Sequence, residues 1–235
     1  MTASGDIRAF IFDIDGTIID SMPSHGQSWQ TFLERHALTY EGDAFLRRTA
    51  GRTGTELMRE LFGPMSDSAA WALVHEKEAI YRDLFRADFR EIPGFRAFAR
   101  GAKAAGIRIA CATAGDAGNI AFAMAGLGME GEFDALVGSN DVAHGKPAPD
   151  LFLLAAERMG VEPRQCAVFE DAPLGIEAAR RAGMSAVAVT SGEPASTLAA
   201  PAHVLTAVSD YLSLDPHHVL ALARARTPHA AKAPA

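Results

Sequence analysis

Two carboxylates in the segment Asp13-Ile14-Asp15-Gly16-Thr17 are the first candidates for chemistry in this sequence. They follow the apolar run of residues 7–13 (IRAFIFD), which predicts a buried strand. If the chain turns at Gly16, the two side chains converge. One could then attack while the other transfers a proton, and a hard cation with oxygen ligands could bind beside them. Asp and Gly are also ordinary turn residues, so this segment alone leaves a plain strand end open.

Two further segments carry groups that suit a bound anion. Thr113, Ala114 and Gly115 precede a predicted helix, where a hydroxyl and backbone N–H groups could hold a phosphate. A threonine before glycine is also a common helix cap. In residues 145–150 (GKPAPD), two prolines fix the backbone around Lys146. A lysine held in this way could neutralise a phosphate and the carboxylate that attacks it, although a solvated loop lysine is the alternative.

Glu170 and Asp171 close the apolar run of residues 166–170 (CAVFE). Adjacent acids at the end of a buried strand repel each other and require a compensating cation. Mg²⁺ meets that need, because it binds one or two carboxylates together with phosphate and water. The competing interpretation is a helix start, where the macrodipole favours acidic residues.

The elements that must position these residues alternate along the chain. Apolar runs predict strands, most of them covered on both faces, at residues 7–13, 107–113, 135–137, 166–170 and 185–190. Helical patterns near residues 95–105, 117–127, 149–160 and 173–182 separate them, and several end at a glycine: Gly106, Gly128, Gly160 and Gly183. This order predicts a doubly wound, Rossmann-like α/β fold with a parallel sheet. The carboxyl ends of the strands meet at one edge, so all four candidate segments should gather there.

One region breaks the alternation. Residues 20–92 are helical in pattern throughout, which is far too long for a simple connection and predicts an inserted all-helical domain. We therefore expect a core of residues 1–19 and 93–225. The Ala/Pro-rich tail of residues 226–235 is expected to be disordered.

Composition narrows the function further. The net charge is −7 and no Lys/Arg cluster is present, which argues against nucleic acid as a partner. No apolar segment approaches the ~18 residues of a membrane span. Two cysteines in apolar runs exclude a disulfide framework, and the first residues do not resemble a signal peptide, so we expect a cytoplasmic protein. The combined inventory of carboxylates, hydroxyl and lysine indicates phosphoryl transfer through an aspartyl-phosphate, with Mg²⁺ as cofactor.

The order of the motifs DIDGT, ATAG, GKPAPD and VFEDAPLGIEAARRAGM resembles the haloacid dehalogenase superfamily over about residues 7–189. The helical insertion is similar to the cap of its β-phosphoglucomutase and small sugar phosphatase subgroup. The resemblance implies that Asp13 is the nucleophile and Asp15 the general acid/base, which excludes the dehalogenase branch. It implies that the phosphoryl group is held by Thr113, the Ala114 N–H and Lys146. Mg²⁺ would bind the Asp13 carboxylate, the Asp15 backbone carbonyl and Asp171, with Glu170 beside it.

The choice between phosphatase and mutase depends on the cap. In Gly51-Arg52-Thr53-Gly54, Gly54 stands where the mutase pattern has the arginine of its second phosphate site. Arg52, two residues away, could substitute, although a shift of two positions in a loop generally redirects a side chain. His25 and Lys77 match positions that mutases use, but they could equally be a helix start and a solvated helix residue. The third and fourth motifs closely resemble bacterial phosphatases that act on fructose-1-phosphate and 6-phosphogluconate.

We therefore expect a Mg²⁺-dependent phosphomonoesterase acting on a small phosphorylated metabolite, in particular a sugar phosphate. A β-phosphoglucomutase-type hexose phosphate mutase is the alternative. A non-catalytic module that binds a phosphorylated ligand ranks below both, because a pure binder has no use for Asp15 as a proton carrier. For assembly we expect a monomer or a small homo-oligomer.

Overall fold

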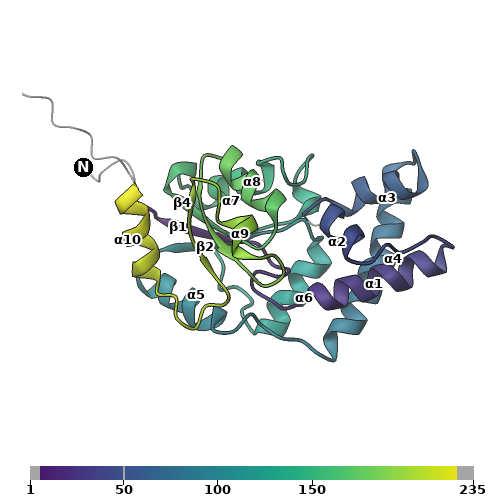
Figure 1. The fold of residues 1–235 in the computed structure, drawn as a ribbon, viewed down its shortest axis with the longest axis horizontal. Helices are drawn as coiled ribbons and strands as arrows, with labels where there is room; N and C mark the ends of the chain where they lie inside the picture. The colour runs from purple at the N-terminus through teal and green to yellow at the C-terminus, as the bar shows by residue number, and fades with distance from the viewer. Residues whose placement is uncertain (1–5, 50, 227–235) are drawn as a thin grey trace, which may run out of the picture.

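The computed structural model describes residues 6–49 and 51–226. In this part of the chain six parallel strands form one sheet in the order β3-β2-β1-β4-β5-β6 (Figure 1). Their bounds are β1 Ala9–Phe12, β2 Arg108–Ala112, β3 Ala135–Val137, β4 Cys166–Glu170, β5 Ser185–Val189 and β6 Val204–Val208. The strand order reverses beside β1, which is where ligands bind in doubly wound sheets. The predicted fold class is confirmed.

Five of the six strands lie where the apolar runs predict them, with ends that differ by at most two residues. The sixth, β6, was not predicted. Its sequence VLTAV follows an alanine-rich stretch, and the strand is only half-buried after Val204, because it forms an edge of the sheet. An edge strand of this kind lacks the continuous apolar character that marks the central ones.

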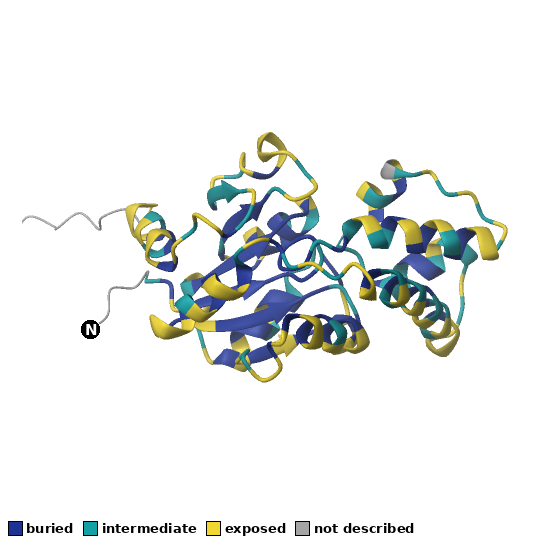
Figure 2. Cartoon of the chain, turned by 90° about the horizontal axis from the view of Figure 1, so that it is seen from below, coloured by how far each residue is buried: buried dark blue, intermediate teal, exposed yellow. Residues whose placement is uncertain are grey.

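Helices cover both faces of the sheet. Alternate strand residues, among them Phe10, Phe12 and Phe169, pack against α5 (Phe95–Ala104), α6 (Ala117–Leu127) and α10 (Pro216–Arg226). Smaller residues such as Ala9 and Ala110 face α7 (Asp150–Met159), α8 (Pro173–Arg181) and α9 (Ala195–Leu198). Short 3₁₀ turns occupy Ser139–Asp141 and Pro163–Gln165. The central strands are buried throughout (Figure 2), so the residues at their ends are held on a rigid support.

Residues between β1 and α5 form four helices: α1 Met22–Arg35, α2 Asp43–Thr49, α3 Gly54–Phe62 and α4 Asp67–Arg86. They lie at one end of the molecule (Figure 1) and enclose their own apolar cluster, which includes Trp29, Phe32, Leu57 and Val74. Local signals explain their starts. Thr53 and Glu56 make a capping box at α3, and the Ser66 side chain accepts from the Ala69 N–H at α4.

The insertion joins the core through two chain segments that run side by side. The Asp20 N–H donates to the Arg90 carbonyl over 2.9 Å, and the Ile92 N–H donates to the Ile18 carbonyl over 2.9 Å. Two adjacent chain segments that connect packed units in this way can act as a hinge between them.

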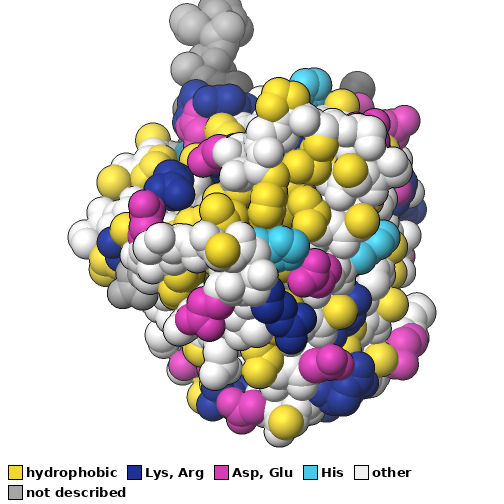
Figure 3. All heavy atoms as spheres, turned by 90° about the vertical axis from the view of Figure 1, so that its right-hand side faces the viewer, with side chains coloured by type: hydrophobic (Ala, Val, Ile, Leu, Met, Phe, Trp, Pro, Cys, Tyr) yellow, Lys and Arg dark blue, Asp and Glu magenta, His cyan; other side chains and the backbone are white. Residues whose placement is uncertain are grey.

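The outer face of the helical insertion mixes side chains of both charge signs with apolar ones (Figure 3). Within the described residues, no helix combines the length and the apolar character needed to cross a membrane. Of the predicted tail, Arg226 is the last residue of α10, and residues 227–235 lie outside the described residues.

Candidate active site

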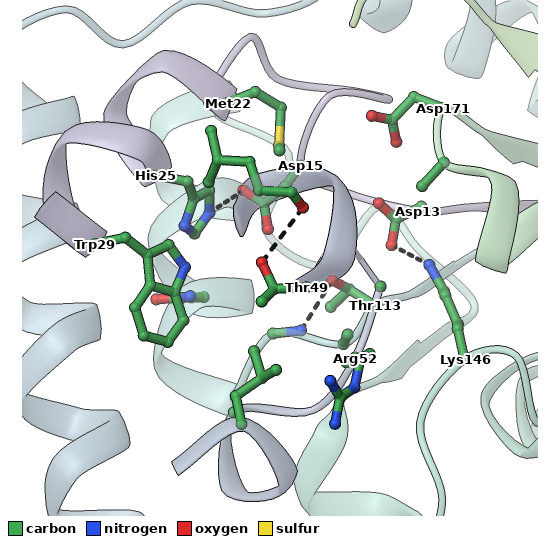
Figure 4. A pocket seen from close by; sticks show the side chains of 18 of the residues that line it. Asp13, Asp15, Met22, His25, Trp29, Thr49, Arg52, Thr113, Lys146 and Asp171 are labelled. Atoms are coloured by element: carbon green, nitrogen blue, oxygen red, sulfur yellow. Dashed lines mark hydrogen bonds and ion pairs between the residues drawn. The ribbon is translucent and has the colours of Figure 1, made fainter. Parts of the chain in front are cut away.

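A pocket opens between the carboxyl edge of the sheet and the helical insertion. Asp13 follows β1, Thr113 follows β2 and Glu170 ends β4, so three neighbouring strands supply its floor. In Figure 4, Asp13, Lys146 and Asp171 lie on one side of the pocket and His25 and Trp29 on the opposite side. Every residue that the sequence analysis selected lines this pocket: Asp13, Asp15, His25, Arg52, Lys77, Thr113, Ala114, Lys146, Glu170 and Asp171.

Lys146 connects the loop after β3 to the end of β1. Its Nζ atom lies 2.6 Å from Asp13 Oδ1 and 3.1 Å from Glu170 Oε2, and its side chain is 1% exposed. Burial disfavours a charged lysine, but the two carboxylates outweigh it and raise the pKa of Lys146. The lysine is therefore a buried, permanently charged group beside Asp13, and the alternative of a solvated loop lysine is wrong.

Asp13, Glu170 and Asp171 form a buried acidic cluster, with one oxygen of each within 4.8 Å of the others. Oε1 of Glu170 is buried and has no hydrogen-bond partner among the described residues. Three oxygen donors with an unpartnered atom fit a hard divalent cation such as Mg²⁺. The fit depends on Gly16, where φ is +77° and a Cβ would stand 2.2 Å from Asp171 Oδ2.

The pKa values of the three carboxyls reflect this crowding. Burial raises the pKa of Asp13 in spite of Lys146, and it raises the pKa of Glu170 strongly. Burial, together with the charge of Asp13, raises the pKa of Asp171 to about 8, although Thr17 donates to it over 3.0 Å. Without a bound cation, these three carboxyls resist ionisation. A cation is therefore needed for all three to be ionised at neutral pH.

The Asp15 carboxylate faces the helical insertion and is not part of the acidic cluster. Its Oδ1 accepts from Ser21 Oγ at 2.7 Å and from Tyr81 OH at 3.0 Å. His25 Nε2 lies 3.1 Å from the same oxygen, without the alignment of a full hydrogen bond. Burial opposes ionisation, but His25 and the two hydroxyls outweigh it and lower the pKa of Asp15. The Asp15 carboxylate is not one of the clustered oxygens, so its backbone carbonyl is the candidate metal ligand at this position.

Thr113 and Ala114 lie between β2 and α6. The Thr113 N–H donates to the Val137 carbonyl over 3.0 Å, which extends the sheet pairing by one residue. Its Oγ1 accepts from the Gly115 N–H at 3.1 Å, so the hydroxyl stands at the start of α6. A hydroxyl and a neighbouring backbone N–H group, such as that of Ala114, suit a phosphoryl group.

His25 and Lys77, which the sequence left undecided, both point into the pocket. Lys77 is 2% exposed, so it is not a solvated helix residue. Its Nζ donates to His25 Nδ1 over 2.7 Å and lies 5.0 Å from the centre of the Trp29 ring. The His25 ring stacks on Tyr81 with centroids 3.8 Å apart. These contacts order the pocket face of the insertion.

Arg52 and Gly54 bear on the second phosphate site of a mutase. Arg52 lines the pocket, but its Nη1 lies 2.6 Å from Glu60 Oε2, so its charge is already paired. At Gly54 an added Cβ would stand 2.8 Å from Val74 Cγ2, because α3 and α4 pack closely there. A larger residue at position 54 would have to displace the Val74 side chain from its place in the helical cluster.

Sequence reasoning missed several side chains that the fold brings to this site: Ser21, Trp29, Thr49, Tyr81, Glu78 and Asn119. Tyr81 carried a usable signal, because it stands four residues after Lys77 and shares its helix face. Ser21 follows the first motif directly. Asn119 lies in α6, and nothing in its sequence context relates it to the helical insertion.

A family model for haloacid dehalogenase-like hydrolases matches residues 7–183. The chain is 39% identical to fructose-1-phosphate phosphatase YqaB of Escherichia coli (strain K12), over 76% of this chain and 94% of that protein. It is 32% identical to β-phosphoglucomutase of Bacillus subtilis (strain 168), over 80% of this chain and 85% of that one. A crystal structure of a family IA hydrolase from Entamoeba histolytica HM-1:IMSS superposes with a TM-score of 0.82 at 27% identity, and covers 93% of this chain and 100% of that chain.

Proposed function

Because the chain belongs to the haloacid dehalogenase-like hydrolases, we propose that it is a phosphatase that hydrolyses small sugar phosphates through a phosphorylated Asp13. The observation that carries the proposal is the position of Asp13. Its carboxyl is buried between the charged Lys146 and the oxygen cluster with Glu170 and Asp171, at the base of a pocket. A second carboxylate, Asp15, lies two residues on.

In this mechanism Asp13 attacks phosphorus in line, and the bond to the sugar oxygen breaks. Lys146 offsets the charge of the attacking carboxylate and of the transferring group, while Thr113 and the Ala114 N–H hold the phosphoryl oxygens. The Asp13, Glu170 and Asp171 carboxylates and the Asp15 carbonyl would hold Mg²⁺, which when bound neutralises phosphoryl charge.

Asp15 carries the proton in both half-reactions. It protonates the departing sugar oxygen and then takes a proton from the water that hydrolyses the aspartyl-phosphate. In the structure its carboxylate accepts hydrogen bonds from Ser21 and Tyr81, which favour its ionised form, so it has to turn from these partners toward the substrate to hold the proton that it donates. The contacts also tie the acid to Ser21, which directly precedes α1, and to Tyr81 in α4, both of which belong to the insertion.

We further propose that residues 20–92 act as a cap that closes over the core of residues 1–19 and 93–225. The paired crossings near Asp20 and Arg90 support hinge motion, and closure would exclude water from the phosphate.

The two cysteines, Cys111 and Cys166, are free and buried, which supports a reducing, cytoplasmic setting.

Hydrolysis is favoured over the mutase reaction by the cap geometry. A mutase must grip a second phosphate while it reorients a bisphosphate. Here Gly54 packs against Val74, and Arg52 is paired with Glu60. The relatives named for phosphatase activity include the YqaB protein at 39% identity and a Thermotoga maritima phosphatase of phosphorylated carbohydrates at 32%.

Phosphate release from a panel of sugar monophosphates, with and without Mg²⁺, tests this proposal. We expect rapid Mg²⁺-dependent release without an isomerised sugar phosphate. If no member of the panel releases phosphate, the proposed function is wrong. If a bisphosphate primes conversion to an isomer, the mutase alternative is correct.

A further inference from the structure

Glu78 on α4 is a half-buried acid in the pocket that the proposed reaction does not use. Its side chain is 13% exposed, and Oε1 lies 3.1 Å from Lys77 Nζ. Oε2 accepts from Asn119 Nδ2 over 2.7 Å. Asn119 Oδ1 in turn accepts from Arg82 Nη1 over 2.8 Å. Glu78 is therefore held between the helical insertion and α6, with its charge directed at the pocket.

The neighbouring cation is already occupied. Lys77 donates to His25 Nδ1 and to Glu78, and these bonds use two of the three donors of the ammonium group. Its charge is offset by the adjacent carboxylate. Burial acts to raise the pKa of Glu78, but Lys77, His25 and the Asn119 bond outweigh it and lower that pKa. The carboxylate is therefore ionised at neutral pH.

The other cationic side chains that line the pocket are paired as well. Arg52 pairs with Glu60, and Lys146 lies between two carboxylates at the opposite end. Among the described lining residues, five carboxylates face three lysine or arginine side chains. The end of the pocket that the helical insertion lines, with His25, Lys77 and Glu78 (the cap end), thus offers hydrogen-bonding groups but no uncommitted positive charge for a second anion.

We propose that Glu78 sets the substrate class: the site accepts a phosphomonoester whose remainder is an uncharged polyhydroxy group, and Glu78 excludes a second phosphate or carboxylate there. The proposal rests on the proposed phosphatase function. Hydroxyl groups can donate to the Glu78 oxygens, whereas a second anion finds the Lys77 charge neutralised by Glu78 and meets a pocket whose carboxylates outnumber its lysine and arginine side chains. Specificity would then come from a repulsive group as well as from attractive ones.

The test compares two esters of one sugar, fructose 1-phosphate and fructose 1,6-bisphosphate. For each, kcat/KM is measured with the wild-type protein and with Glu78→Gln, which keeps the hydrogen-bonding shape and removes the charge. We expect the preference for the monophosphate to fall about tenfold or more, which corresponds to ~1.4 kcal/mol of lost discrimination. Asp83→Asn is the matched control. Asp83 is exposed on the same helix, so its loss changes the net charge equally and should leave the preference unchanged.

A preference that stays within about twofold of wild type in Glu78→Gln would overturn the proposal while the phosphatase function stands. Ionic strength gives a second measurement without a variant, because salt weakens repulsion between partly exposed charges and should reduce the wild-type preference. Should the wild type hydrolyse neither ester nor any other member of the sugar phosphate panel, the phosphatase function fails. Calorimetric binding of both esters to Asp13→Asn and to Asp13→Asn/Glu78→Gln then decides the role of Glu78 by itself. An equal ratio of Kd values in the two backgrounds would contradict it.

Discussion

The two ends of the pocket are built on different supports. At the phosphate end, Asp13 and Thr113 directly follow buried strands, and their N–H groups donate to the Phe169 and Val137 carbonyls over 3.0 Å each. At the cap end, Glu78 stands on a helix face, and its position depends on how α1, α4 and α6 pack. In the proposed reaction, bonds therefore break at the rigid sheet edge, and the substrate is recognised by helices that can vary independently.

Removal of the nucleophile tests the phosphate end most severely. Asp13→Asn should abolish phosphate release, with a loss of more than about 10⁴-fold in kcat, because an amide is a poor nucleophile and cannot replace the attacking carboxylate beside Lys146. Phosphate release is the measurement, and circular dichroism checks the fold. Turnover above background in a folded variant would exclude Asp13 as the nucleophile.

Asp15→Asn tests the residue that joins the two ends. We expect kcat to fall by about 10²–10⁴-fold, the usual contribution of general acid–base catalysis. Mg²⁺ affinity should stay nearly unchanged, because the Asp15 carboxylate lies outside the acidic cluster and the proposed metal contact at this residue is its backbone carbonyl. Kinetic assays and calorimetric Mg²⁺ titration measure the two effects. A large loss of metal affinity would contradict this assignment.

In the absence of Mg²⁺, a rise in pH should destabilise the fold through the carboxyls of the phosphate end. The pKa of Asp171 is about 8 in the metal-free fold and ~3.9 in an unfolded chain, so the folded state binds more protons between these values. The free energy of unfolding without metal should therefore fall as pH rises through this window. Excess Mg²⁺, which binds the ionised cluster, should raise the melting temperature more at about pH 8 than at about pH 5.

Scanning calorimetry with chelator or with Mg²⁺ measures this difference. Asp171→Asn serves as the control, since it removes the titrating carboxyl and should remove most of the pH dependence of the Mg²⁺ effect. Equal gains in melting temperature at both pH values in the wild type would count against a metal-binding role for the cluster.

The smallest effect is expected at the cap end, for Arg52→Ala. Its partner Glu60 is 44% exposed, and ion pairs of this kind contribute about 0–1 kcal/mol. We expect kcat/KM for sugar monophosphates to change by less than about threefold. A loss of more than about tenfold would mean that Arg52 leaves Glu60 to grip the substrate, and would revive the mutase alternative.

Much of the phosphate end could be predicted from the chain alone. Continuously apolar runs mark the central strands, and in a parallel sheet their carboxyl ends share one edge, so Asp13, Thr113 and Glu170 had to meet there. The half-buried edge strand β6 escaped prediction for the complementary reason, since it lacks that apolar signal. A continuous run of apolar residues indicates a strand that is buried on both faces, and this signal weakens where one face of the strand is exposed to solvent.

The cap end was decided by tertiary packing. The sequence alone shows Lys77 and Glu78 as neighbouring charges on a helix, a pattern that solvated helices share. Only the packing of α4 against α1 and α6 places them beside His25 and Asn119, where both side chains line the pocket. Local sequence therefore predicted the five strands other than β6, the motif order and the residues of the phosphate end, because each follows from short-range pattern. Which charges face the substrate depends on long-range helix contacts, and that was settled only by the folded structure.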